Sequence, residues 1–170
     1  CHITTALQSI VSRTLNPRDS AVVSVTKVVG GEAYNIIPHT ATISGTARFF
    51  SREVAGQIEA GLARVAQGVA AGFGATAELS WRLIFAPTIN DPERAETIAA
   101  AAAELVGADK VARNNAAGMG SEDFSFMMER VPGAYIHVGN GDGEMPHHPR
   151  YQFNDDAIPF GSALYARVVE

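Results

Sequence analysis

The stretch Ala41-Thr42-Ile43-Ser44-Gly45-Thr46-Ala47-Arg48-Phe49, followed by Ser51, decides the fold of the first half of this chain. Small and apolar residues occupy every second position, and polar residues lie between them, which is the period of a half-exposed β-strand. Ser51 is placed to cap a helix. The residues after it carry apolar side chains at helical spacing: Val54, Ile58, Leu62, Val65 and Val69. The sequence therefore predicts a strand that runs directly into an amphipathic helix.

The neighbouring segments extend this pattern. An amphipathic helix begins at the first residue and is ended by the turn over 16–20, and a valine-rich strand over 21–29 follows it. Residues 34–50 are predicted to be extended with a break near Pro38, and a further strand is predicted over 75–85. One additional strand before the first helix completes the order βαββαβ, a ferredoxin-like sandwich. We expect that strand in earlier chain, because the first helix lacks start signals.

Residues 87–170 differ from the first half in the kinds and order of their predicted elements. A turn-rich junction begins at Pro87, and an alanine-rich helix is predicted after it over 93–106. A short helix is predicted over 121–130 with Ser121 as its N-cap. A buried strand over 134–138, a loop over 139–149 and a closing helix from Asp155 complete the prediction. One strand is too little sheet for a complete α/β domain. We predict an α+β chain with a ferredoxin-like domain over 1–86 and part of an α/β domain over 87–170.

The composition excludes several classes of protein. There are 13 Lys and Arg residues against 18 Asp and Glu residues, and the basic residues do not cluster, which argues against a nucleic-acid or anionic membrane surface. A single cysteine rules out an internal disulfide framework and suits a reducing compartment. The cytoplasm is therefore the default expectation for its location.

Two adjacent histidines form the first candidate site. His147 and His148 lie between Pro146 and Pro149, and prolines on both sides restrict the backbone that carries the imidazoles. Imidazole suits divalent transition metals, but adjacent surface histidines are more often solvated, and one segment cannot supply every ligand of a metal site.

The other candidates could bind a substrate. Gly118, Met119, Gly120 and Ser121 precede a helix whose free N–H groups could face a substrate oxygen, or could simply begin a well-capped helix. Arg48 points outward from its strand and could hold a carboxylate, although a lone strand arginine is more often solvated. Asn35 could equally be a turn residue.

Four motifs occur in order along the chain: Gly31-Glu32-Ala33-Tyr34-Asn35-Ile36-Ile37-Pro38, Gly45-Thr46-Ala47-Arg48, Gly120-Ser121-Glu122-Asp123-Phe124 and His147-His148-Pro149-Arg150-Tyr151. Together they closely resemble the M20 family of metal-dependent amidohydrolases, in the branch that contains hippurate hydrolases, N-acyl-amino-acid amidohydrolases and plant auxin-conjugate hydrolases. The resemblance implies that residues 1–86 are most of a lid that also forms a homodimer. Residues 87–170 would be the C-terminal part of the catalytic domain.

The resemblance also implies roles for single residues. The family binds two divalent metal ions, with Zn, Mn, Co and Ni not distinguishable here, and His147 matches the ligand in its last segment while His148 occupies a variable position. Asn35 and Arg48 match lid residues that contact substrate, the arginine through the substrate carboxylate. Residues Gly118 to Ser121 match a loop that lines the pocket. The remaining ligands and the general base map upstream, so this chain contains no mapped catalytic residue and is expected to be inactive alone.

The expected function of the whole protein is hydrolysis of the amide bond of hippurate-like N-acyl amino acids. One alternative is a non-catalytic ferredoxin-like module that dimerises or binds a ligand, since that fold hosts many functions. Another is a different activity of the same family, such as that of a dipeptidase, a deacetylase or a carboxypeptidase.

Overall fold

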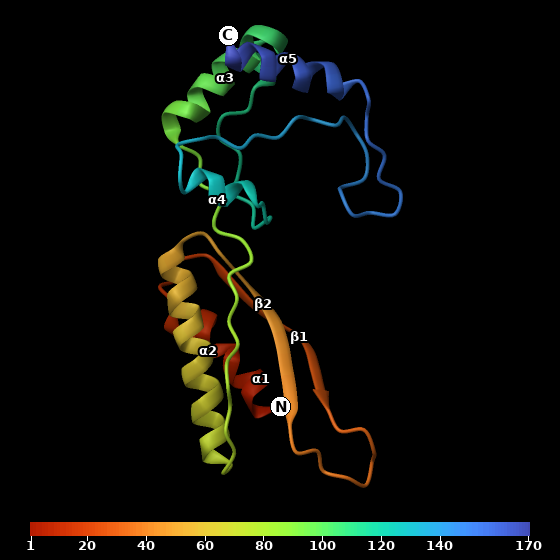
Figure 1. Cartoon of the computed structure of the whole chain (residues 1–170). Coiled ribbons are helices and arrows are strands. Elements are labelled where there is room, and N and C mark those ends of the chain that lie inside the picture. The colour runs from red at the N-terminus through yellow and green to blue at the C-terminus, as the bar shows by residue number, and fades with distance from the viewer. The chain divides into compact units, whose positions relative to one another are not determined.

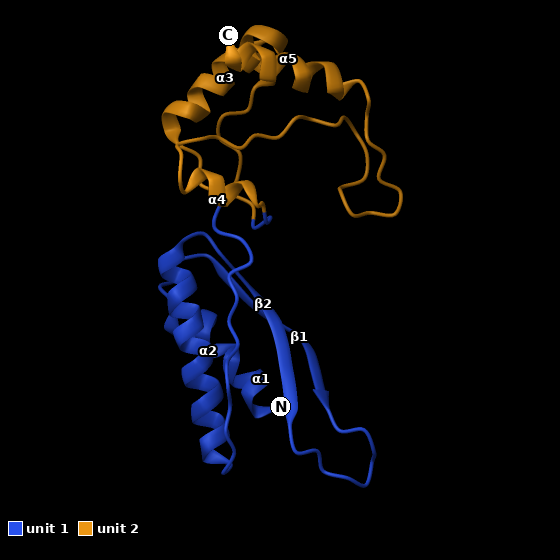
Figure 2. Cartoon of the chain, viewed as in Figure 1, with its two compact units in different colours: residues 1–87, 119–121 blue, residues 88–118, 122–170 orange.

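The computed structural model describes residues 1–170, and the chain folds into two compact units (Figure 2). Unit 1 contains Cys1–Pro87 together with Met119–Ser121. Unit 2 contains Thr88–Gly118 and Glu122–Glu170. None of the helices is both long enough and apolar enough to cross a membrane.

Unit 1 is a layer of helices on a two-stranded antiparallel sheet (Figure 1). Its elements are α1 (His2–Leu7), the π-helical turn η1 (Ile10–Thr14), β1 (Ala21–Gly30), β2 (Ala41–Phe49) and α2 (Arg52–Gly72). Side chains from η1, α2 and both strands meet in two apolar clusters, in which Ile10 and Ile58 are fully buried. This packing buries the apolar stripe of α2 that the sequence predicts.

The start of α2 is built as predicted. Ser51 has an extended backbone, and its side chain accepts a hydrogen bond from the Val54 N–H at 3.1 Å. This bond satisfies one of the free donors at the helix N-terminus. The cap fixes the point at which β2 ends and α2 begins, and so fixes the end of the strand on which Arg48 lies.

A β-bulge separates the two halves of the ladder. Val25 pairs with Gly45 and Lys27 with Ser44, so Thr26 is an extra residue in β1. A Cβ on Gly45 would lie 2.1 Å from the Ser24 carbonyl oxygen. Only glycine therefore fits at position 45 without a shift of the backbone.

Unit 2 consists of helices joined by long non-helical segments. Its elements are α3 (Pro92–Val106), the 3₁₀ turn η2 (Ala108–Lys110), α4 (Phe124–Met128) and α5 (Ala157–Val169). Asp91 caps α3 by accepting from the Arg94 N–H at 3.0 Å, and α3 is bound to α5 by an Arg167–Glu104 ion pair at 2.8 Å. Leu164 is the one buried apolar side chain in this unit.

Three predicted extended segments differ from the structure. The strands predicted over 75–85 and 134–138 are absent, and the second segment is not buried, because neither segment has a strand beside it to complete a ladder. Residues 31–40 are a loop, so only the second part of the extended stretch predicted over 34–50 is a strand. The sheet thus has two of the three strands expected within residues 1–86, and the ferredoxin-like pattern is not completed.

The other differences lie in helices. The helix predicted at the start of the chain is divided into α1 and η1. Ser9 and Ser12 there donate hydrogen bonds to the carbonyls of Ala6 and Gln8, and these bonds compete with regular helical bonds. The helix predicted over 121–130 is α4 alone. Its N-cap position is Asp123 rather than Ser121, and the Asp123 side chain makes no capping bond.

Candidate functional site

Arg48 is held on the outer face of the sheet in unit 1. Its neighbours Ala47 and Phe49 pack into the apolar cluster beneath, so the alternation of the strand leaves Arg48 exposed, as predicted. The Arg48 Nη1 atom donates a hydrogen bond to the backbone carbonyl of Met119, which belongs to the same unit. The structure thereby brings together two of the residues singled out in the sequence. The remaining N–H groups of the guanidinium are available to a ligand.

Residues 118–121 are here called the pocket loop, and the space beside their two glycines is free of other atoms of the chain. A Cβ added to Gly118 or Gly120 would meet no atom within 4 Å. Packing within the chain therefore does not demand glycine at either position, in contrast to Gly45. The space beside the backbone is available for another group to approach.

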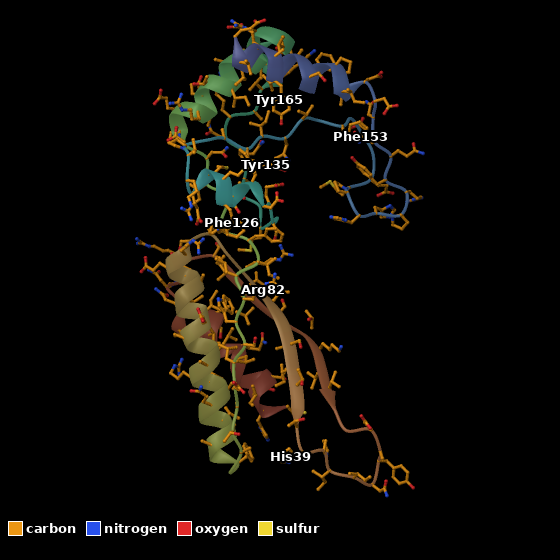
Figure 3. The ribbon with its side chains drawn as sticks, in the orientation of Figure 1. His39, Arg82, Phe126, Tyr135, Phe153 and Tyr165 are labelled. Carbon is orange, nitrogen blue, oxygen red and sulfur yellow. The ribbon has the colours of Figure 1, made fainter.

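Asn35 lies away from Arg48. It is an exposed residue of the 31–40 loop, which connects the end of β1 to the start of β2 and also carries His39 (Figure 3). The ladder runs from the Gly30–Ala41 pair next to this loop to the Arg48–Val22 pair near its other end. Seven residues of strand at roughly 3.3 Å each place Arg48 about 23 Å from the loop. Within one copy of the chain these two predicted substrate residues are not brought together.

The two histidines differ in their surroundings. His148 Nδ1 accepts the Arg150 N–H at 3.2 Å and lies 3.7 Å from a Glu144 carboxylate oxygen. The His147 side chain makes no hydrogen bond or ion pair, and His147 is the one non-glycine residue with a positive φ, 74°. Residues in this conformation are uncommon, and they are found more often at functional sites than elsewhere.

This chain does not assemble a metal centre by itself. No three His, Cys, Asp or Glu side chains gather in a way that could hold a metal ion. A free imidazole on a restricted backbone suits the donor chemistry of one ligand in a larger set. His147 fits that description, whereas one ring nitrogen of His148 is already engaged.

Sequence reasoning missed a polar cluster beside the pocket loop, in unit 2. The Glu122 carboxylate accepts the Phe124 N–H at 3.2 Å and interacts with the side chains of Asp123 and Tyr135. The Phe124 bond is the largest cause of a lowered pKa at Glu122, and hydrogen bonding to Glu122 raises the pKa of Tyr135. Twelve residues lie between the two partners, and no periodic pattern joins them, so no signal in the sequence could have paired them.

Comparison with known proteins identifies the family. The model of peptidase family M20/M25/M40 matches residues 5–170. The chain belongs to this family. The resemblance to the M20 family is thereby confirmed, and the match includes the second half of the chain as well as the first.

Individual M20 proteins are similar along nearly the whole chain. N-acetylcysteine deacetylase of Bacillus subtilis is 34% identical over 98% of this chain and 43% of its own length. Hippurate hydrolase of Campylobacter jejuni is 32% identical over 96% of this chain and 43% of its own length. A crystal structure of a Bacillus subtilis dinuclear metal binding peptidase from the M20 family superposes with a TM-score of 0.78, at 32% identity over 98% of this chain and 42% of that one. The M20 peptidase fold is thereby confirmed, and the chain spans about two fifths of the length of these relatives.

Proposed function

We propose that the whole protein is a metal-dependent amidohydrolase that cleaves the amide bond of N-acyl amino acids. Two relatives support this substrate class by their names, an N-acetylcysteine deacetylase and a hippurate hydrolase. Acetyl and benzoyl groups differ, but both substrates are amino acids with a free carboxylate. Hippurate-like compounds are therefore the substrates to test first. The match of residues 88–170 to the family argues against a free-standing ferredoxin-like module.

The contact between Arg48 and the Met119 carbonyl is the observation that carries this proposal. A guanidinium that is fixed at one N–H still offers a fork of donors, whose spacing suits the two oxygens of a carboxylate. Arg48 would bind the amino-acid end of the substrate beside the pocket loop. Binding at this end places the amide at a defined position relative to the metals.

His147 would supply one metal ligand from this chain. Divalent metal ions at such sites polarise a carbonyl and lower the pKa of bound water. The positive φ of His147 and its free side chain support this choice over His148. With one ligand in residues 1–170, we propose that the chain alone is inactive.

The Arg48 role has a direct test in the whole protein. Arg48→Ala removes the carboxylate partner, so kcat/KM for an N-acyl amino acid should fall about 10- to 100-fold, the size of a charge-assisted hydrogen-bond pair. The methyl ester of the same compound lacks the charged carboxylate, so kcat/KM for the ester should fall little in the variant. Steady-state kinetics on both compounds decide the point, and an equal loss on both would refute the role.

His147 and His148 form a matched pair of variants. His147→Ala should lower the metal content of the purified protein, measured by elemental analysis, whereas His148→Ala should retain it, because His148 Nδ1 is occupied by the Arg150 N–H. A loss of metal in the His148 variant alone would exchange the two assignments.

We further propose a homodimer in which the 31–40 loop of one copy serves the site of the other. The separation of about 23 Å between Arg48 and this loop prevents both from contacting one small substrate within a single copy. The loop exposes Tyr34, Ile36 and Ile37, which is more apolar surface than a solvated turn requires. A two-fold symmetric pair would give each site an Arg48 from one copy and an Asn35 from the other.

Mixing inactive variants tests the dimer. In a mixed dimer of Asn35→Ala and Arg48→Ala subunits, one site would have both wild-type residues and the other would have neither. Random exchange should then restore about a quarter of the wild-type activity from two impaired proteins. If both residues act within one copy, mixing restores nothing.

A further inference from the structure

Residues 141–151, here called the histidine loop, are closed at their base by one side chain. The segment contains no helix or strand. Asn140 lies directly before it, and its Nδ2 atom donates a hydrogen bond to the Gln152 carbonyl at 2.9 Å. Its Oδ1 atom accepts the Asn154 N–H at 2.7 Å, on the returning arm where Figure 3 labels Phe153. One amide therefore joins the point where the chain enters the loop to the point where it leaves.

A second closure lies nearer to the tip of the loop. The Arg150 Nη2 atom donates to a Glu144 carboxylate oxygen at 2.5 Å. Between these two residues, the His148 N–H donates to the Met145 carbonyl at 3.1 Å. Because an exposed ion pair contributes little by itself, the loop depends mainly on the two backbone bonds that Asn140 makes at its base.

His147 lies within this closed loop in a conformation that its residue type does not favour. Its φ of 74° is the one positive value outside the glycines. A β-carbon makes such a backbone costly, and it persists where the surrounding structure holds it. A loop with fixed ends keeps the imidazole in place before a metal ion arrives, so that metal binding does not have to order the loop.

We infer that Asn140 is a positioning residue for metal binding, which closes the histidine loop and so holds His147 ready as a ligand. This role rests on the proposed function, because His147 has its ligand role only there. Asn140 itself touches neither metal nor substrate in this account. The closure is formed entirely within unit 2.

Titration of the metal-free whole protein with Zn²⁺, followed by calorimetry, provides the measurement. His147→Ala identifies the binding that depends on this ligand. Asn140→Ala should weaken that binding about tenfold, the lower end of the range for residues that orient metal ligands. A smaller loss is not expected, because both bonds at the base are removed together.

Asn90→Ala is the matched control. Asn90 also makes two backbone hydrogen bonds in unit 2, since its amide accepts the Tyr135 N–H at 2.8 Å and donates to the Tyr135 carbonyl at 2.9 Å. These bonds lie outside the histidine loop. The Asn90 variant should therefore lose stability as the Asn140 variant does and keep the Zn²⁺ affinity of wild type. Equal weakening of Zn²⁺ binding in both variants would overturn the inference.

Hydrogen exchange gives a second measurement that needs no variant. In the wild-type whole protein, the Asn154 amide should exchange more slowly than exposed amides without a partner, because Asn140 accepts its N–H. Rapid exchange of this amide would show that the closure does not form, and would overturn the inference even if Asn140→Ala failed to fold.

An assay of N-acyl amino acid hydrolysis on the same samples distinguishes this inference from the proposed function. Zn²⁺ binding that depends on both His147 and Asn140, in a wild-type protein without this activity, would refute the proposed function and leave the inference standing. An active wild type whose Asn140→Ala variant binds Zn²⁺ normally would refute the inference and leave the function. Zn²⁺ binding that is unchanged in His147→Ala would overturn both the ligand role and the inference.

Discussion

The two units differ in what holds them together. Unit 1 packs helices on a sheet, and nine of the ten buried apolar side chains of the chain, all except Leu164, lie in it. Unit 2 relies on polar side-chain contacts: Asn90 fixes Tyr135, and Asn140 fixes residues 152 and 154. One ion pair joins α3 to α5, and another joins α3 to Arg113. Apolar burial contributes more to stability than exposed polar contacts do. The first region has a core of its own, whereas the second exposes the apolar side chains that a core would need.

The largest expected effect concerns the isolated segments. Residues 1–87, expressed alone, should unfold cooperatively in urea because both apolar clusters lie within them. Residues 88–170 alone should show no cooperative transition, since one buried leucine offers little apolar burial. Circular dichroism during the urea titration distinguishes the two outcomes. A sharp transition in residues 88–170 would contradict the claim that only the first segment has a core of its own.

Two isoleucine variants sharpen the same contrast. Ile58 is 0% exposed and Ile158 is 53% exposed. Ile58→Ala should lower the free energy of unfolding by about 2–5 kcal/mol, because it leaves a cavity in the core. Ile158→Ala in the 170-residue chain should lower the free energy of unfolding by about 1 kcal/mol or less. A larger cost of Ile158→Ala in the whole protein would show that another part of it covers α5; equal costs at both positions in the chain would contradict the account.

Variants of two glycines distinguish a position where packing requires glycine from one where space is left for a ligand. Gly45→Ala places a methyl group 2.1 Å from the Ser24 carbonyl oxygen and should destabilise unit 1 by about 1–3 kcal/mol. Gly118→Ala meets nothing within 4 Å and should leave the melting temperature unchanged, while it raises KM in the whole protein if substrate occupies that space. Thermal denaturation and kinetics on both variants provide the check; a destabilised Gly118 variant would not fit.

The smallest effect is a pH dependence in unit 2. Glu122 has a pKa below its ordinary value when folded, mainly through the Phe124 N–H. The stability it contributes is therefore fully present above the ordinary carboxyl pKa and is lost as the pH falls through the lowered folded value. In the whole protein, the melting temperature of wild type should exceed that of Glu122→Gln at neutral pH, and the gap should close on acidification. A gap that widened in acid would have the wrong sign.

The sequence predicts well the elements that depend on nearby residues. The alternation of β2 places Arg48 outward, the apolar stripe of α2 faces the core, and Ser51 caps the helix, because each depends on neighbours within a few positions. The strands predicted over 75–85 and 134–138 fail because a strand needs a partner that local periodicity cannot supply. The contact of Asn90 with Tyr135 spans 45 positions, and the left-handed backbone of His147 has no periodic signature. The pairing of Asn90 with Tyr135 and the backbone conformation of His147 were therefore beyond the sequence, although the family resemblance already favoured His147 as the ligand.

The most direct test of the central claim is a single assay of hippurate hydrolysis by the whole protein and by the 170-residue chain, side by side, with and without added divalent metal. We expect metal-dependent release of glycine by the whole protein and none by the chain, because this chain offers one metal ligand and no mapped base. Turnover by the chain alone, or no turnover by the metal-loaded whole protein on any N-acyl amino acid, would contradict it.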